Sequence, residues 1–221
     1  MSGAPSPRTR VKRPHERAAY DRATIDAILD AALGCHLGFE RDRQPDVIPT
    51  LHARIRDLLF FHGSSASRTV RALGEGIPAC VTVTLVDGIV LAPSVFQHSI
   101  NYRSVVVLGT ATAVTDPVEK NAALEPFTEK LLQGRWADAR RPSRMELKAT
   151  GVLSLPLDEA SAKVRTGPPD DGETPDVELD VWAGEIPLAV KALAPVPSPD
   201  LRAGIPVPAY AQHYSQAGLT H

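Results

Sequence analysis

Small hydroxyl side chains and an arginine follow an apolar run in the stretch LLFFHGSSASR, residues 58–68. The apolar residues are typical of a strand, and the serines stand where a helix over residues 65–74 is expected to begin. Hydroxyls, backbone N–H groups and an arginine are the donors that hold a phosphate group. Two interpretations stay open at this point: Ser67 only caps the helix, or Ser64, Ser67 and Arg68 together form a cradle for an anion.

Two further polar positions lie at the ends of apolar strands. His62 either caps a strand end by a hydrogen bond or acts as an acid or orienting group beside a substrate. Arg103 and Ser104 begin an apolar strand, where Arg103 is either a surface cation or a ligand of an anionic group. The seven histidines lack the spacing of a metal site such as H-x-x-x-H, so no metal ion is expected.

The elements that must position these residues follow from periodicity. An amphipathic helix is expected from Asp21 to Gly34, and a second helix begins at Asp116 with aspartate as N-cap and proline at the next position. Strands are expected over residues 35–40, 46–53, 57–62, 78–86, 102–114, 150–157 and 178–188, with a hairpin turn at Asp87-Gly88. Hairpins rather than repeating βαβ units predict a mainly β (α+β) fold, a six- to eight-stranded antiparallel barrel with peripheral helices.

Composition narrows the class of protein. The chain has 221 residues, a net charge of −2 and two distant cysteines, Cys35 and Cys80. A near-neutral charge argues against nucleic acid as a partner, and unpaired cysteines favour a reducing cytoplasm. No apolar run is long enough for a membrane span or a signal peptide. We expect a basic flexible arm over residues 1–18, one domain over residues 19–190 and a proline-rich extended tail over residues 191–221.

The order of motifs along the chain resembles one known family. VIPT, FFHG followed by SxxSR, VTVT, NYRSVVVLG, DPxE and WAGEIP succeed one another over roughly residues 11–190. This order resembles the pyridoxamine 5′-phosphate oxidase-like family of FMN-binding split β-barrels, and within it the branch similar to nitroimidazole reductases. The resemblance therefore implies an antiparallel split β-barrel with peripheral helices.

The resemblance also implies the cofactor contacts. Ser67 and Arg68 match the pair that grips the FMN phosphate, while the VIPT strand runs beside the flavin ring. The full set that it assigns to the cofactor is Ile48, Pro49, Thr50, Leu51, Phe61, His62, Ser64, Ser67, Arg68, Arg103, Ser104 and Trp182. Thr69 stands where the oxidase itself has a lysine, and the tail lacks the basic substrate-binding segment of that enzyme. Pyridoxamine 5′-phosphate is therefore not the expected substrate.

The resemblance implies a homodimer that binds FMN at the subunit interface. We expect it to reduce a small electrophile, a nitro compound or a quinone, with electrons from NAD(P)H, and His62 is the candidate catalytic residue. The flavin carries the redox chemistry, so the protein supplies binding, orientation and electrostatics. One alternative is a related split barrel that binds haem or the deazaflavin F420, with His62 or His98 as an axial haem ligand. Another is a flavin-binding sensor without catalytic activity.

Overall fold

Two antiparallel sheets form the body of the protein in a computed structural model that describes residues 3–13, 15–170 and 175–214. The larger sheet has seven strands and does not close, and the smaller sheet has four. In the larger sheet the order is β1 (Ala18–Ala19), β10 (Ala160–Arg165), β7 (Ser99–Thr110), β6 (Pro78–Leu91), β2 (Gly34–Arg41) and β3 (Gln44–Leu51), with β11 (Gly184–Pro187) also on β6. The smaller sheet runs β4 (Ala53–Ile55), β5 (Leu58–Ser64), β9 (Thr150–Pro156) and β8 (Thr112–Val114). The predicted split-barrel fold is confirmed.

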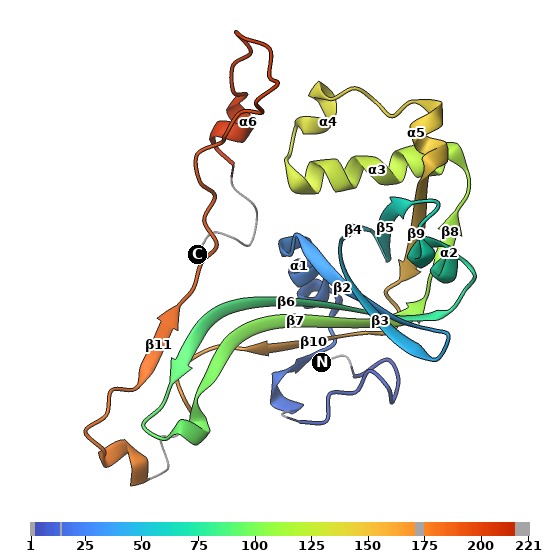
Figure 1. Cartoon of the computed structure of the whole chain (residues 1–221). Helices are drawn as coiled ribbons and strands as arrows, with labels where there is room; N and C mark the ends of the chain where they lie inside the picture. Colours follow the sequence, from blue (N-terminus) through green and yellow to red (C-terminus); the bar gives the residue numbers. More distant parts are fainter. Residues whose placement is uncertain (1–2, 14, 171–174, 215–221) are drawn as a thin grey trace.

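Helices lie around these sheets rather than between repeating strands (Figure 1). They are α1 (Arg22–Ala31), α2 (Arg68–Gly74), α3 (Pro117–Leu131), α4 (Arg135–Asp138), α5 (Arg144–Ala149) and α6 (Ala209–Gln212), with 3₁₀ turns η1 (His15–Arg17), η2 (Val95–Gln97) and η3 (Pro175–Glu178). The predicted cap at Asp116 is present, since its carboxylate accepts from Val118 N and Glu119 N. The Asp21 carboxylate caps α1 in the same way, by accepting from Thr24 N. These side chains satisfy N–H groups that a helix leaves free in its first turn.

The main core lies where the strands cross beneath α1. Alternate residues of β2 point into it, as the period of two predicts, so Cys35, Leu37 and Phe39 are buried. They meet Leu29 of α1 and Leu155 of β9, both fully buried, and therefore join the two sheets and the helix in one apolar cluster.

The Asp87-Gly88 pair does not form a hairpin turn, so that prediction was wrong. Strand β6 continues through it to Leu91, with a bulge between Val86 and Gly88. The Asp87 carboxylate is held by Arg103 of the neighbouring strand, at 2.8 and 2.7 Å, and β11 pairs with Gly88 on the other side. A Cβ on residue 88 would lie 3.2 Å from the Ile186 carbonyl oxygen. The glycine therefore allows β11 to approach β6 closely, and it does not serve to form a turn.

Further boundaries differ from the sequence predictions. The helix expected to end at Gly34 ends at Ala31, and Gly34 begins β2. The strand expected over residues 102–114 is two strands, β7 and β8, which belong to different sheets and are separated at Ala111. Of the strand expected over residues 178–188, only β11 forms a strand, and residue 178 belongs to η3. The helix expected over residues 65–74 begins at Arg68. The predicted arm and tail extend into residues 1–2, 14 and 215–221, which lie outside the described residues.

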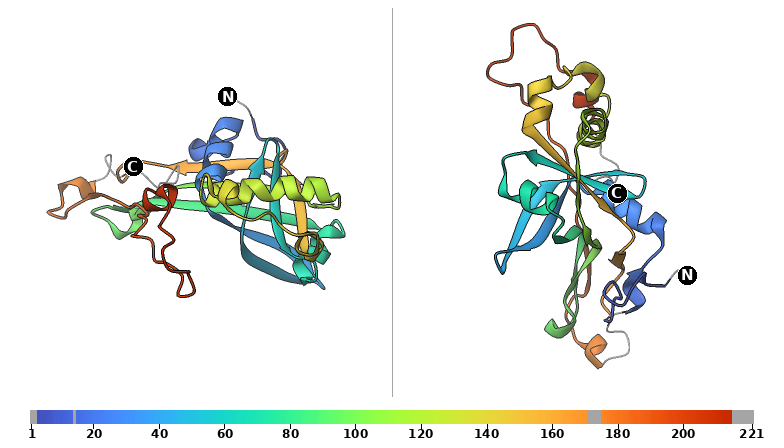
Figure 2. Two further views of the ribbon diagram at one scale, coloured as in Figure 1. Left: turned by 90° about the horizontal axis from the view of Figure 1, so that it is seen from above. Right: turned by 90° about the vertical axis from the view of Figure 1, so that its right-hand side faces the viewer.

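The chain after β11 leaves the sheet and returns toward the helices. Figure 1 shows it rising from β11 to α6 beside α4, and the two further views in Figure 2 show the turn between β6 and β7 projecting away from α3. This tail has little regular structure before α6, in keeping with its prolines. We call residues 188–214 the C-terminal arm.

Candidate functional site

A cavity of about 180 Å³ lies between β3, β5 and the start of α2. It is lined by Leu37, Ile48, Pro49, Thr50, Phe61, His62, Gly63, Ser64, Ser67, Thr69, Val70 and Leu153. Seven of the twelve positions that the sequence assigned to a flavin are among them: Ile48, Pro49, Thr50, Phe61, His62, Ser64 and Ser67. The structure therefore brings together residues from the VIPT strand and from the FFHGSSAS segment in one hollow.

The two serines of the cavity hold the chain around the beginning of α2. Ser67 caps the helix, since its Oγ accepts from Val70 N at 3.1 Å, and Ser64 Oγ accepts from Ala66 N at 3.2 Å. The cap at Ser67 is therefore present, and the cradle for an anion stays a prediction. A hydroxyl that accepts a hydrogen bond keeps its own proton to donate. Both serines therefore retain a donor for an anionic ligand.

Arg68 lies just outside this cavity. It lines an adjoining cavity of about 150 Å³ with Arg41, and the two cavities share Ile48 and Thr69 in their walls. Arg41 is engaged by Asp46 at 3.0 Å, whereas no ion pair joins Arg68 to a carboxylate of the described chain. Arg68 is therefore the cation of the double cavity that is free to bind an anion.

His62 is held at the inner end of the cavity. Its ring meets the Phe127 ring of α3 edge to face, with centroids 4.5 Å apart, and its backbone pairs with Val152 of β9. Burial lowers the pKa of His62, because a charged imidazolium would lose its hydration there. At neutral pH the side chain is a neutral imidazole that can donate one hydrogen bond and accept another.

A glycine pair that the sequence analysis did not single out shapes the wall of the cavity. Gly63 and Gly151 face each other across β5 and β9, and α2 packs directly upon them. A Cβ on residue 151 would lie 2.4 Å from Val70 Cγ1. Single glycines inside strand patterns mark such close approaches, and this was the signal by which Gly151 could have been found.

Four predicted flavin positions lie elsewhere. Leu51 packs in a smaller apolar cluster with Ala53 and Phe60. Arg103 is bound to Asp87, and Ser104 Oγ donates to the Lys163 carbonyl at 3.2 Å. Trp182 is largely exposed before β11. None of these four residues lines the cavity within the described chain, so their contact with a flavin stays a prediction.

Fold and cavity together define the class: an antiparallel split barrel with a cavity lined by β3, β5 and the start of α2. The model of the pyridoxamine 5′-phosphate oxidase family matches residues 21–164, and this chain belongs to that family. The resemblance found in the sequence is confirmed. Among curated proteins, none matches the chain.

Solved structures sharpen the comparison. The flavocytochrome Anf3 from Azotobacter vinelandii is 41% identical, with 97% of this chain and 100% of that chain covered and a TM-score of 0.92. The FAD and haem binding protein from Mycobacterium smegmatis is 37% identical, with 88% of this chain and 95% of that chain covered and a TM-score of 0.83. A candidate 5-nitroimidazole antibiotic resistance protein from Bacteroides thetaiotaomicron is 21% identical and shares the fold with a TM-score of 0.57. The match covers 66% of this chain and 86% of that chain. The chain thus belongs among split barrels related to flavin- and haem-binding proteins.

Two absences among the described residues complete the picture. No helix of the described chain is long and apolar enough to cross a membrane. Nor do three or more His, Cys, Asp or Glu side chains of residues 3–13, 15–170 and 175–214 gather where they could hold a metal ion.

Proposed function

We propose that this protein is a flavin-dependent oxidoreductase that reduces a small electrophile with electrons from NAD(P)H. The observation that carries this proposal is the single cavity in which Pro49, Thr50, His62, Ser64 and Ser67 meet. Main chain and small side chains from a strand face serine hydroxyls across a hollow, with Arg68 beside it. These are the donors and the open strand edge that a flavin phosphate and ring require.

Different residues of the cavity would bind the phosphate, contact the flavin ring and orient the substrate. Ser64 and Ser67 would donate their hydroxyl protons to the phosphate, and Arg68 would balance its charge. Pro49 and Thr50 would fix the ring plane from one side. The neutral imidazole of His62, steadied by Phe127, would donate a hydrogen bond to an oxygen of the substrate and orient it. When bound, a flavin would supply the redox chemistry, hydride transfer from NAD(P)H to the acceptor.

The sequence points to FMN, and the adjoining cavity leaves room for a larger flavin. The second hollow begins at Arg68 and Thr69 and continues to Arg41 and Phe39. A larger flavin such as FAD would extend from the first hollow past Arg68 toward the second. Denaturing the purified protein and separating the released flavin by chromatography distinguishes the two.

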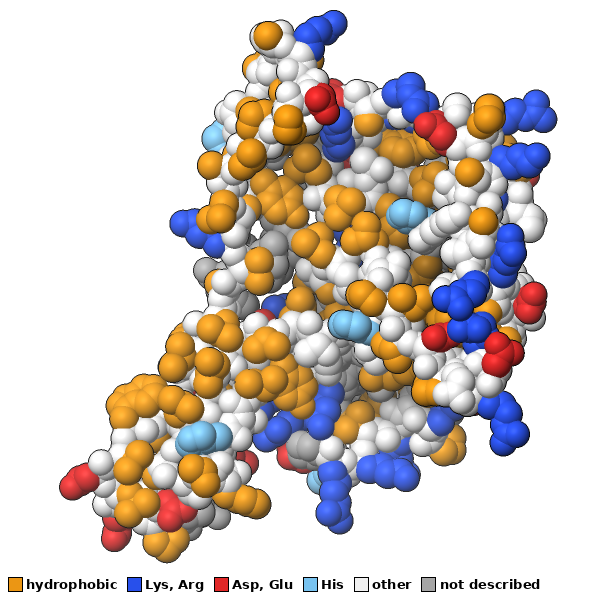
Figure 3. All heavy atoms as spheres, in the orientation of Figure 1, with side chains coloured by type: hydrophobic (Ala, Val, Ile, Leu, Met, Phe, Trp, Pro, Cys, Tyr) orange, Lys and Arg blue, Asp and Glu red, His pale blue; other side chains and the backbone are white. Residues whose placement is uncertain are grey.

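We further propose that the active form is a homodimer. A cavity of about 180 Å³ is smaller than the roughly 300 Å³ at which ligand pockets begin, so a second copy would supply the missing wall. Large apolar side chains are exposed over the β6–β7 turn and the C-terminal arm, as the orange areas of Figure 3 show. The most exposed of them are Val95, Phe96, Leu193 and Val196. Such patches mark interaction surfaces, and light scattering of wild-type protein and of Phe96→Asp tests this one.

A second candidate function adds haem to the flavin. Both relatives above 35% identity carry flavin and haem or cytochrome in their names. The family model ends at residue 164, whereas the flavocytochrome covers 97% of the chain, so the C-terminal arm is part of that likeness. A flavin-binding sensor and a deazaflavin F420 protein are the remaining alternatives.

Cys35 and Cys80 are unpaired, which accords with the cytoplasm as the compartment.

The test uses the full chain and two variants. We expect purified protein, or protein incubated with excess flavin, to show flavin absorbance that bleaches on addition of NADPH or NADH under argon. His62→Gln keeps a polar amide at the position, so we expect it to retain flavin while substrate reduction falls at least tenfold. Retained flavin that neither nicotinamide reduces would favour the sensor instead. Full activity in both His62→Gln and His62→Ala would overturn the role of His62.

A further inference from the structure

A second, larger cavity, of about 690 Å³, is separate from the cavity proposed for the flavin. Three distant segments form its walls: α1 and β4, the second half of α3 with the turn that follows, and the C-terminal arm. The lining from the arm consists of Tyr210, His213 and Tyr214. A volume of this size is in the range of pockets for small molecules and cofactors.

The arm is fastened over this cavity by specific hydrogen bonds. Tyr210 Oη donates to the Asp138 carboxylate at 2.6 Å and accepts from Arg135 at 3.1 Å. Its ring lies against Gly134, whose positive φ of 87° turns the chain out of α3. Gly134 N and Trp136 N both donate to Glu129, which fixes that turn. The arm is therefore a built wall of the cavity.

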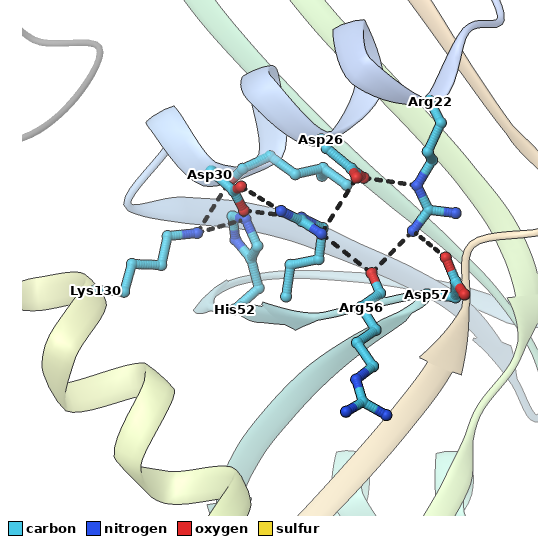
Figure 4. Close-up of polar contacts among 9 residues, drawn as sticks. Arg22, Asp26, Asp30, His52, Arg56, Asp57 and Lys130 are labelled. Atoms are coloured by element: carbon cyan, nitrogen blue, oxygen red, sulfur yellow. Dashed lines mark hydrogen bonds and ion pairs between the residues drawn. The ribbon is translucent and has the colours of Figure 1, made fainter.

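The opposite wall carries charges of both signs, since Lys130 and Arg54 line it together with Asp30 and Glu129. Figure 4 shows Lys130 beside His52 and Asp30. Lys130 Nζ lies 2.9 Å from the Leu29 carbonyl and 2.8 Å from His52 Nε2, and Arg54 is paired with Asp30 and Asp26. Burial lowers the pKa of Lys130 to about 8. Cationic heads on one side and tyrosine rings on the other suit a flat aromatic group that carries carboxylates.

Of the described histidines, only His213 is among the lining residues of this cavity, and it is exposed. His52 is buried behind the wall, with Nε2 engaged by Leu29 and Lys130, and His62 packs on Phe127 in the flavin cavity. His98, the other axial ligand considered from the sequence, accepts a hydrogen bond from Ala92 N at the far end of the molecule. His15 lines a different hollow, formed by the N-terminal residues.

The two cavities share structural elements. Along α3, Phe127 touches His62 of the flavin cavity, and Lys130, one turn later, lines the large cavity. Along the chain from β3 to β4, Thr50 lines the first and Ala53 the second. Three residues of extended chain span about 10 Å. Groups bound in the two cavities would therefore be close neighbours.

We propose that the cavity beneath the C-terminal arm is a haem site, with His213 as a ligand of the iron and Lys130 and Arg54 facing the propionates. Neutral imidazole is a common axial ligand of haem iron. This inference rests on the second candidate function above. It adds the place of the haem and the residues of this chain that would hold it.

The test is a titration of the full-length protein with haemin, followed by absorbance. We expect wild-type protein to bind one haem per chain with a shifted Soret band, and His15→Ala to behave in the same way. His213→Ala should bind at least tenfold more weakly or with a different Soret position, and added imidazole should restore the wild-type band. Flavin content should stay within twofold of wild type in both variants. Tyr210→Phe, which loses the anchor to Asp138, should weaken haem binding by a smaller factor.

The outcomes separate this inference from the proposals on which it rests. A His213→Ala protein with the wild-type Soret band and affinity overturns the assignment of the iron ligand. A wild-type protein that retains flavin but binds no haem overturns the haem site and leaves the flavin function standing. A protein that takes up haem but no flavin overturns the flavin function and not the haem site.

Discussion

The two cavities are built in opposite ways. The cavity proposed for the flavin is small and lies among strands, and its lining comes mainly from two short stretches, residues 48–50 and 61–70. The cavity beneath the C-terminal arm is larger, and its residues come from positions as distant as Asp30, Lys130 and His213. A short stretch can be found by its residue types, whereas a cavity made by distant segments exists only once the chain has folded.

Their polar residues differ as well. In the cavity proposed for the flavin, Ser67 caps α2, Ser64 accepts from Ala66 N in the preceding turn, and the His62 ring contacts Phe127, so the polar groups are positioned mainly by nearby contacts. Beneath the arm, the buried pair of His52 and Lys130 depends on contact between α1, α3 and the chain after β3. The following variants test this contrast between local and tertiary positioning.

The largest effect is expected from His52 on acidification. Burial and the nearby Lys130 lower the pKa of His52 to about 4 from an ordinary 6.5. The unfolded chain therefore takes up a proton near pH 6.5 that the folded protein refuses until about pH 4. The contribution of His52 to the free energy of unfolding is therefore fully present above pH 6.5. It falls by about 3 kcal/mol as the pH is lowered to about 4. Denaturant unfolding of wild type and His52→Asn over this range should show a flatter pH dependence for the variant. Parallel curves would contradict the assignment.

Gly151→Ala should damage the flavin cavity directly. The added methyl group meets Val70 at 2.4 Å, and Val70 is part of the cavity wall. Overpacking of this kind should lower the free energy of unfolding by about 2 kcal/mol and reduce flavin content. Gly3→Ala is the control, because nothing lies within 4 Å of a Cβ there. Equal stability and equal flavin content in the two variants would argue against the close packing of α2 on β9.

Arg68→Ala should weaken flavin binding about tenfold, because a charged hydrogen bond to phosphate contributes roughly 1.5 kcal/mol or more. Arg71→Ala is the matched control, since Arg71 lies one turn later in α2 and lines neither part of the double cavity. Flavin affinity is measured by fluorescence titration. Similar losses in both variants would point to general electrostatics instead of a specific contact.

Asp87→Asn should have the smallest effect. The ion pair with Arg103 is partly buried and bidentate, so its loss should lower the free energy of unfolding by about 1 kcal/mol. We expect the flavin content to stay unchanged, and likewise in Arg103→Ala. Loss of flavin from Arg103→Ala at intact stability would return Arg103 to the flavin site that the sequence predicted.

Regular patterns decided how much the sequence could predict. Alternation in β2 and β6 and the caps at Asp21 and Asp116 act over a few residues, so these elements were predictable. The Asp87-Gly88 pair misled because its usual preference for a turn is overridden by pairing with β7 and β11. Lys130 and His213 gain their roles from contacts with distant segments that no local pattern marks. Gly151 carried one local signal, a single glycine inside a strand pattern, which shows a close approach but not the partner.

The absorption spectrum of purified full-length protein, taken before and after incubation with excess flavin, tests the central claim most directly. We predict flavin absorption bands that correspond to nearly one flavin per chain in the wild-type protein. The number of flavins per chain should be lower in Arg68→Ala and unchanged in Arg71→Ala. A protein that stays free of flavin after incubation would contradict the assignment of the cavity between β3, β5 and α2.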